Sequence, residues 1–243
     1  MLSHLYQNIV LKNPKSIFIL LLITLLSFGY FSKDFRLDAS SETLLIEGDP
    51  DLEYLKKINE RYGSKDFLVL TYSPNEGMVT DSSINNLLSL KYKIQSLDWV
   101  HNVVTLLDIP LLNNSSAPLQ ERLESFKTLK DENVDKERGF KEILNSPVFR
   151  NFVISEDGKT SGIIVYIKKV KLKDIENKSK KEIEIYKDTL KKKNHENITQ
   201  IRRIIKNYDN IGKIYLGGIP MIADDMMSFI KSDIIVFGLG VLL

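Results

Sequence analysis

The residue types that most often carry enzyme chemistry are few and widely spaced in this chain. Its three histidines are His4, His101 and His195. No two of them have the short spacing that places metal ligands on one face of a helix or strand. His4 precedes the first apolar segment, and His101 is expected to be an ordinary surface residue at the mouth of a strand. The histidines therefore predict no metal centre.

Two adjacent carboxylates, Asp224 and Asp225, are the other candidates for chemistry. On a helix, neighbouring side chains point about 100° apart, so these two cannot share one site as a catalytic pair would. Pro220 is typical of the first turn of a helix, where acidic residues complement the helix dipole. The pattern favours this structural role for both aspartates.

The motifs of common enzyme classes are also missing. The sequence contains no Gly-x-Ser-x-Gly nucleophile turn and no phosphate-binding glycine loop. Residues 216–220, LGGIP, have the glycines of a tight turn but lack the residues of a P-loop, and DPDLE lacks the ligand pattern of a calcium loop. The absence of cysteine removes thiol nucleophiles, disulfides and cysteine-based zinc sites. We therefore expect no enzymatic activity and no catalytic, cofactor-binding or metal-binding residues, and the substrate-contacting residues stay unassigned.

The overall composition is that of a folded protein with no strong charge preference. Of 243 residues, 43% are hydrophobic and 27% are charged, and the net charge is +2. Residues 168–206 nevertheless contain fourteen Lys or Arg and only six Asp or Glu. Apolar residues at 183, 186, 190, 198, 201, 205 and 208 follow helical spacing. This segment predicts a long helix with one buried face and a solvated basic back, with lipid-headgroup contact as the alternative, and no nucleic-acid partner is expected.

The N-terminal segment predicts a membrane helix. Residues 16–32 carry no charge, and this length is at the short end of the about 17–25 residues that cross a bilayer. Tyr30 and Phe31 suit the lipid–water interface. A cleaved signal peptide is the alternative, but its apolar region would be shorter, about 7–15 residues, and would end at a small-x-small site. We expect an uncleaved helix with residues 1–15 in the cytoplasm.

Residues 33–219 then predict one extracytoplasmic domain of the α+β class. The expected elements are helix 49–62, strand 66–73, a helix with Asp81 as N-cap, strand 100–108, two strands around the Asp157-Gly158 turn, helix 171–207 and strand 213–220. Their order approaches a βαββαβ plan, a four-stranded sheet backed by two helices on one face. One strand of the Asp157-Gly158 hairpin is expected at a sheet edge.

Residues 110–147 interrupt this plan as an insertion. The first part, PLLNNSSAPLQ, is typical of a loop, and the rest has a charged helical pattern with little apolar surface. We expect a solvated helical insertion rather than a part of the core.

Residues 220–243 predict an amphipathic helix that runs into a second membrane span. Apolar side chains repeat with helical spacing at Ile222, Met226, Phe229 and Ile230. Lys231 and Asp233 mark the expected water–lipid boundary, and residues 234–243 carry no charge but cover only about half of the hydrocarbon core. Because a helix end inside lipid leaves carbonyl groups unsatisfied, we expect a truncated second transmembrane helix and a longer native protein.

The whole layout resembles the N-terminal portion of RND-superfamily exporters of the MMPL type, which are related to Patched and sterol-sensing-domain proteins. The most similar stretches are DPDLEYLKKINERYGSKDFLVL, before and within the first domain strand, and GGIPMIADDMMSFIKSDI, which leads into the second membrane helix. The resemblance implies a porter-like, ferredoxin-like domain in a multi-pass protein of the inner (cytoplasmic) membrane. It also implies proton-driven export of lipid-like or amphiphilic substrates, without a cofactor, together with the remaining transmembrane repeats of the same protein.

Two other readings stay open. An ABC-type permease of the lipoprotein-release or macrolide-export kind has the same helix–domain–helix order but takes its energy from a separate ATPase. A two-helix sensor or adaptor would use the extracytoplasmic domain to bind a ligand and signal across the membrane. Intramembrane acidic residues in further helices would favour the RND type.

Overall fold

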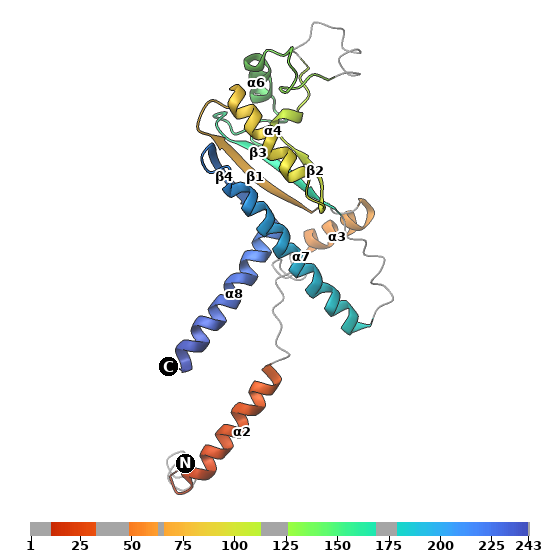
Figure 1. Cartoon of the computed structure of the whole chain (residues 1–243). Helices are drawn as coiled ribbons and strands as arrows, with labels where there is room; N and C mark the ends of the chain where they lie inside the picture. Colours follow the sequence, from red (N-terminus) through yellow and green to blue (C-terminus); the bar gives the residue numbers. More distant parts are fainter. Residues whose placement is uncertain (1–10, 33–48, 63–65, 113–125, 169–178, 243) are drawn as a thin grey trace. The chain divides into compact units, whose positions relative to one another are not determined.

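The computed structural model describes residues 11–32, 49–62, 66–112, 126–168 and 179–242 (Figure 1). The chain divides into two compact units, Met1–Asp38 and Ala39–Leu243. Most of residues 1–15 and the predicted entry to the domain, residues 33–48, lie outside the described residues, as do the start of the basic segment and the middle of the insertion.

The first unit contains helix α2 (Pro14–Ser32), so the helix predicted over residues 16–32 is present. Its side chains are apolar and almost all exposed. Among the described residues, it is the one helix that is both long and apolar enough to cross a membrane. A signal sequence near the N-terminus can also meet these criteria of length and composition, so this finding leaves both sequence interpretations in place.

The second unit is built around a four-stranded antiparallel sheet. Its strands are β1 (Phe67–Pro74), β2 (Val100–Val104), β3 (Ser161–Ile167) and β4 (Gly212–Gly217), arranged in the order β2-β3-β1-β4. Helix α4 (Asp81–Gln95) connects β1 to β2, and α7 (Lys180–Lys206) lies between β3 and β4 in the chain. Each strand–helix–strand unit therefore encloses one strand of the other unit. The predicted α+β class is confirmed.

Helices α4 and α7 contribute to one core with one face of this sheet (Figure 1). Burial alternates along β1 and β3, as expected for strands with one covered face. The fully buried positions include Leu68, Leu70 and Tyr72 of β1, Ile163 and Val165 of β3, Leu90 and Ile94 of α4, and Ile198 and Ile201 of α7. The alternate side chains point to the other face and are half-buried or exposed, and Phe67 and Tyr215 are exposed.

The predicted hairpin around Asp157-Gly158 is only partly correct. Gly158 has the expected left-handed conformation, with φ of 69°. Residues 151–155 do not form a strand, because the backbone N–H groups of Phe152 and Val153 donate locally to the carbonyl of Phe149. The strand that follows, β3, lies between β2 and β1 rather than at an edge. Its alternating buried residues could not distinguish these two positions.

The helix predicted within residues 110–147 is present, but the prediction that this segment is solvated and outside the core is wrong for the part that the structure describes. Residues 126–147 contain helix α6 (Lys136–Asn145) and bury Leu129, Val134 and Ile143 in the main core. The apolar residues of this stretch are few, and Phe140 and Leu144 also pack against the core. A few buried apolar side chains therefore suffice to attach this charged segment to the core.

Helix boundaries differ slightly from the predictions. Helix α3 (Pro50–Tyr62) is present as expected, and the Asp51 N–H donates to Asp49 Oδ1 at 2.9 Å. Helix α4 is capped by Thr80 rather than Asp81, because Thr80 Oγ1 accepts the Ser83 N–H at 3.2 Å. Both residue types are good N-caps, so sequence alone did not distinguish between them.

Helix α8 (Ile219–Leu242) begins directly after β4 and runs without a break, as predicted. The turn between them is Gly218, whose φ is 118°, and a Cβ there would lie 3.0 Å from the Phe67 carbonyl oxygen. We expect Gly218→Ala to cost about 1–3 kcal/mol because of backbone strain and this close contact. Chemical unfolding of the full chain measures the loss.

Gly217 provides a matched control for this prediction. A Cβ at Gly217 would lie 3.7 Å from the nearest atom, an ordinary contact, and its φ is not in the left-handed region. Gly217→Ala is therefore expected to cost clearly less than Gly218→Ala. Equal costs would contradict a special conformational role for Gly218.

Candidate functional site: the joint between α7 and α8

Helix α8 leaves the sheet in contact with α7, β1 and β4 (Figure 1). Its inner side includes Met221, which packs against the core, and Asp224, which faces α7. Its outer side carries Ile219, Ile222 and Phe229, which are exposed. The first turns of α8 thus join the domain to a helix that is free of charge from Ile234 onward.

The centre of this joint is a contact between His195 of α7 and Asp224 of α8. His195 Nδ1 lies 2.9 Å from Asp224 Oδ1. The Asp224 side chain is 6% exposed, and its second oxygen, Oδ2, is buried without a hydrogen-bond partner among the described residues. The two residues are 29 positions apart, which is why spacing along the chain did not reveal the pair.

Two further contacts flank the pair. One Arg202 guanidinium nitrogen donates to both carboxylate oxygens of Asp225, at 2.7 and 2.9 Å. The side-chain amide of Asn194 donates to the Pro220 carbonyl oxygen at 2.8 Å. Together, three side chains of α7 contact three residues near the beginning of α8. Charged and bidentate contacts of this kind fix orientation as well as distance.

The predicted roles of Asp224 and Asp225 need correction. The first turn of α8 contains no acidic residue, because the helix begins at Ile219 and both aspartates follow that turn. They do not act mainly on the helix dipole, since each has a specific partner on α7. The prediction that they cannot share one site is confirmed, because they contact different residues. The basic content of α7, which supplied Arg202, was the available sequence signal for one of these contacts.

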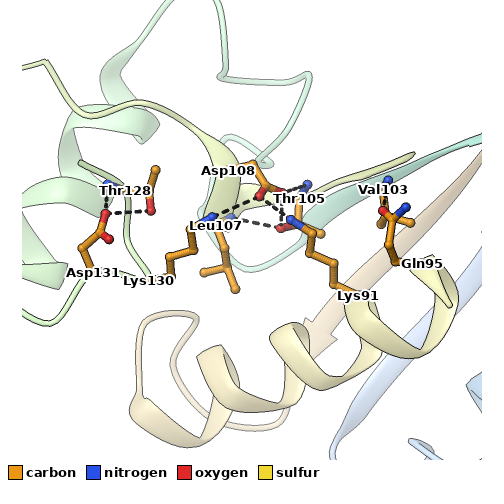
Figure 2. A network of polar contacts seen from close by, with 9 residues as sticks. All are labelled: Lys91, Gln95, Val103, Thr105, Leu107, Asp108, Thr128, Lys130 and Asp131. Carbon is orange, nitrogen blue, oxygen red and sulfur yellow. Dashed lines mark hydrogen bonds and ion pairs between the residues drawn. The ribbon is translucent and has the colours of Figure 1, made fainter. Parts of the chain in front are cut away.

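A second polar network fastens the short helix η2 (Leu106–Asp108) after β2 (Figure 2). The Thr105 N–H donates to Asp108 Oδ2 at 2.8 Å, and the Leu107 N–H donates to Thr105 Oγ1 at 3.2 Å. Lys91 of α4 forms an ion pair with Asp108, and Lys130 Nζ lies 3.7 Å from the same carboxylate. This network ties β2, α4 and the segment after residue 126 together. Its role is structural.

The charge of Asp108 is stabilised by this environment. Burial by itself raises the pKa of the Asp108 carboxyl, but the hydrogen bonds from Lys91 and Thr105 and the positive charge of Lys91 outweigh burial and hold the pKa below its usual value. The Thr-x-x-Asp pattern recurs as Thr128 and Asp131, where the Thr128 N–H donates to Asp131 Oδ2 at 2.6 Å. The capping-box spacing of both pairs was visible in the sequence.

The remaining candidates lie apart from the joint. His101 lies on edge strand β2 with an exposed side chain, and its carbonyl oxygen accepts a hydrogen bond from Gln95, in keeping with the expected surface role. Within the described part of the chain, no group of three or more acidic or histidine side chains could hold a metal ion. A small hollow beside α4 is lined mainly by polar residues such as Asn75, Ser82 and Asn86. Sites for small organic ligands are usually mostly apolar.

A comparison of the chain with protein-family models found no matching family, and a comparison with curated proteins found no matching relative. The fold and the joint define a structural class. It is an α+β domain whose last strand passes through one glycine into a long helix, in a chain that also carries a separate apolar helix.

Proposed function

We propose that this chain is the N-terminal helix–domain–helix unit of a proton-driven membrane transporter of the RND superfamily, MMPL type. The unit contributes to the export of lipid-like or amphiphilic substrates, with α2 as its first membrane helix and α8 as the lead into its second. The domain between them is extracytoplasmic. The protein is not an enzyme in this proposal, and the rest of the transporter supplies its proton-relay groups.

The observation that carries the proposal is the continuity of β4, Gly218 and α8. A helix of 24 residues begins one residue after the sheet and continues into a charge-free apolar run. A rigid connection of this kind suits a domain that must move together with a membrane helix. A domain tethered for binding alone would work equally well on a flexible linker.

The sheet supports the same proposal. Its strand order, β2-β3-β1-β4, with two interleaved strand–helix–strand units, favours the ferredoxin-like plan that we propose for a porter domain. Fold alone is a weak argument for function, because such sheets serve many purposes. The proposal therefore depends on the order helix–domain–helix together with the stiff joint.

Transport by the complete polypeptide in sealed vesicles tests this proposal. With an imposed proton gradient, we expect transport of a fluorescent amphiphile that a protonophore abolishes. Insertion of Gly-Gly-Pro after Lys231 should reduce the transport rate at least about tenfold, because proline and glycine interrupt the helix that couples domain and membrane. The same insertion between the exposed residues Glu132 and Asn133 serves as the control.

Three outcomes would contradict the proposal. Transport that needs ATP and survives the protonophore would favour an ABC-type permease. Absence of any transport would favour a sensor or adaptor. An unchanged transport rate after insertion at Lys231 would exclude coupling through α8, even if the transporter assignment were correct.

A further inference from the structure

The contact between His195 and Asp224 joins an exposed imidazole to a buried carboxylate. The His195 side chain is 60% exposed, whereas that of Asp224 is 6% exposed. Asp224 Oδ1 lies 2.9 Å from His195 Nδ1, and Oδ2 has no partner within the described part of the chain. A carboxylate withdrawn from water with a single protein donor is costly to keep charged. The stability of the contact therefore depends strongly on the charge of that donor.

Histidine is the side chain that ordinarily changes charge between about pH 5 and 8. As an imidazolium, His195 would offset the negative charge of Asp224. As a neutral imidazole, it could donate one hydrogen bond through Nδ1 but could not offset the charge. The attraction is therefore stronger with the proton bound and weaker after the proton is lost. Because solvent reaches His195, the proton can exchange without unfolding of the joint.

We propose that His195 and Asp224 form a proton-sensitive latch between α7 and α8. With His195 protonated, the latch is closed and α8 is held against α7. After deprotonation, the attraction between opposite charges is lost, while the Arg202–Asp225 and Asn194–Pro220 contacts remain. Helix α8 then samples a wider range of directions about its beginning at Gly218. The latch would thus convert a change in pH on the domain side into a change in the angle of α8.

The charged groups of α7 and α8 near the latch leave it dependent on His195. On α8, Asp225 is paired with Arg202 of α7. Within one turn of His195, α7 also carries Lys191, Lys192, Lys193 and Glu196. Among the residues that the structure describes, the hydrogen-bond donor to Asp224 is His195, and the second oxygen of Asp224 has no partner.

The other elements packed against α7 and α8 do not replace His195 either. Strand β1 has no Asp, Glu, Lys, Arg or His, and its Tyr72 is buried and hydrogen-bonded to Ser83. Strand β4 has one charged residue, Lys213, near the end of the strand away from α8. On α4, Lys91 pairs with Asp108, and Lys93 lies over the Tyr208 ring. Among the described residues of these elements, His195 is therefore the side chain that contacts the buried carboxylate.

Distance measurements on the full chain in lipid nanodiscs test the latch. The chain has no cysteine, so spin labels can be attached through Lys193→Cys on α7 and Ser228→Cys on α8. At about pH 5 we expect one narrow distance distribution, and at about pH 8 a second, longer distance. The population of the second distance should rise about fivefold, the factor that corresponds to about 1 kcal/mol.

Two variants identify the groups responsible. His195→Gln keeps a donor without a titrating charge, and Asp224→Asn removes the buried charge while keeping nearly the same shape. Each variant should abolish the pH dependence of the distances, and Asp224→Asn provides the test if His195→Gln does not fold. His101→Gln, on exposed strand β2, should leave the pH dependence unchanged.

Two results would overturn the latch: wild-type distances that are identical at both pH values, or a pH response that persists in His195→Gln. The proposal rests on α7 and α8 alone. Its failure would leave the transporter assignment untouched, and loss of that assignment would not change the expected distances.

Discussion

Replacing Ile163 with alanine is expected to lower the free energy of unfolding by about 2–5 kcal/mol. Ile163 is fully buried in β3, an interior strand of the sheet, on the face that packs into the main core. The loss combines the transfer free energy of the deleted atoms with the cavity that remains. Chemical denaturation of the full chain in mild detergent, followed by circular dichroism, measures it.

The neighbouring Ile164 is a matched control within the same strand. It is the same residue type but points to the opposite face of the sheet and is only half-buried. Ile164→Ala should cost about 1 kcal/mol or less, because the Ile164 side chain buries less apolar surface than that of Ile163 and its truncation leaves no enclosed cavity. Similar losses for the two variants would contradict a sheet with one core face.

Replacing Asp108 with alanine is expected to cost about 2–3 kcal/mol at neutral pH. The substitution removes the carboxylate that accepts the Thr105 N–H in the capping box of η2, and it leaves the half-buried Lys91 without its ion-pair partner. Asp131→Ala is the matched control, because Asp131 accepts the same two Thr hydrogen bonds from Thr128. Unfolding free energies of both variants isolate the contribution of Lys91; equal losses would mean that Lys91 adds nothing.

The pH dependence of this effect has a definite sign. The pKa of the Asp108 carboxyl is lowered in the folded chain, so its contribution to stability is complete above the usual aspartate pKa of about 3.9. The contribution is lost as the pH falls from there through the lower folded pKa. The difference in unfolding free energy between the wild type and Asp108→Asn should therefore shrink on acidification. A difference that stays constant with pH would contradict this account.

Local patterns along the chain predicted most individual elements. Helices α4, α7 and α8 were visible from the spacing of their apolar residues, and β1 was visible from its β-branched run. Backbone geometry sets the period of side chains along a helix or a strand, so such patterns can be recognised in a short stretch of sequence. The turn at Gly158 and the glycine pair before α8 were visible for the same reason. These features depend on residues close together in the chain.

The arrangement of those elements was harder to predict. The interior position of β3 depends on which strands pair, and a buried period-two pattern suits either an interior strand or a covered edge. The burial of Leu129, Val134 and Ile143 depends on the surface that the rest of the domain offers them. A count of apolar residues in the segment carries no information about that surface.

The candidate site shows the same division. By itself, the sequence determined an α+β domain. It also determined an apolar helix before that domain, a basic helix within it and an unbroken helix after its last strand. Only the tertiary structure decided that His195 meets Asp224 and that Arg202 meets Asp225. The physical reason is that these pairs form where α7 and α8 pack together. Their partners are set by strand order and by the angle at Gly218, not by any spacing along the chain.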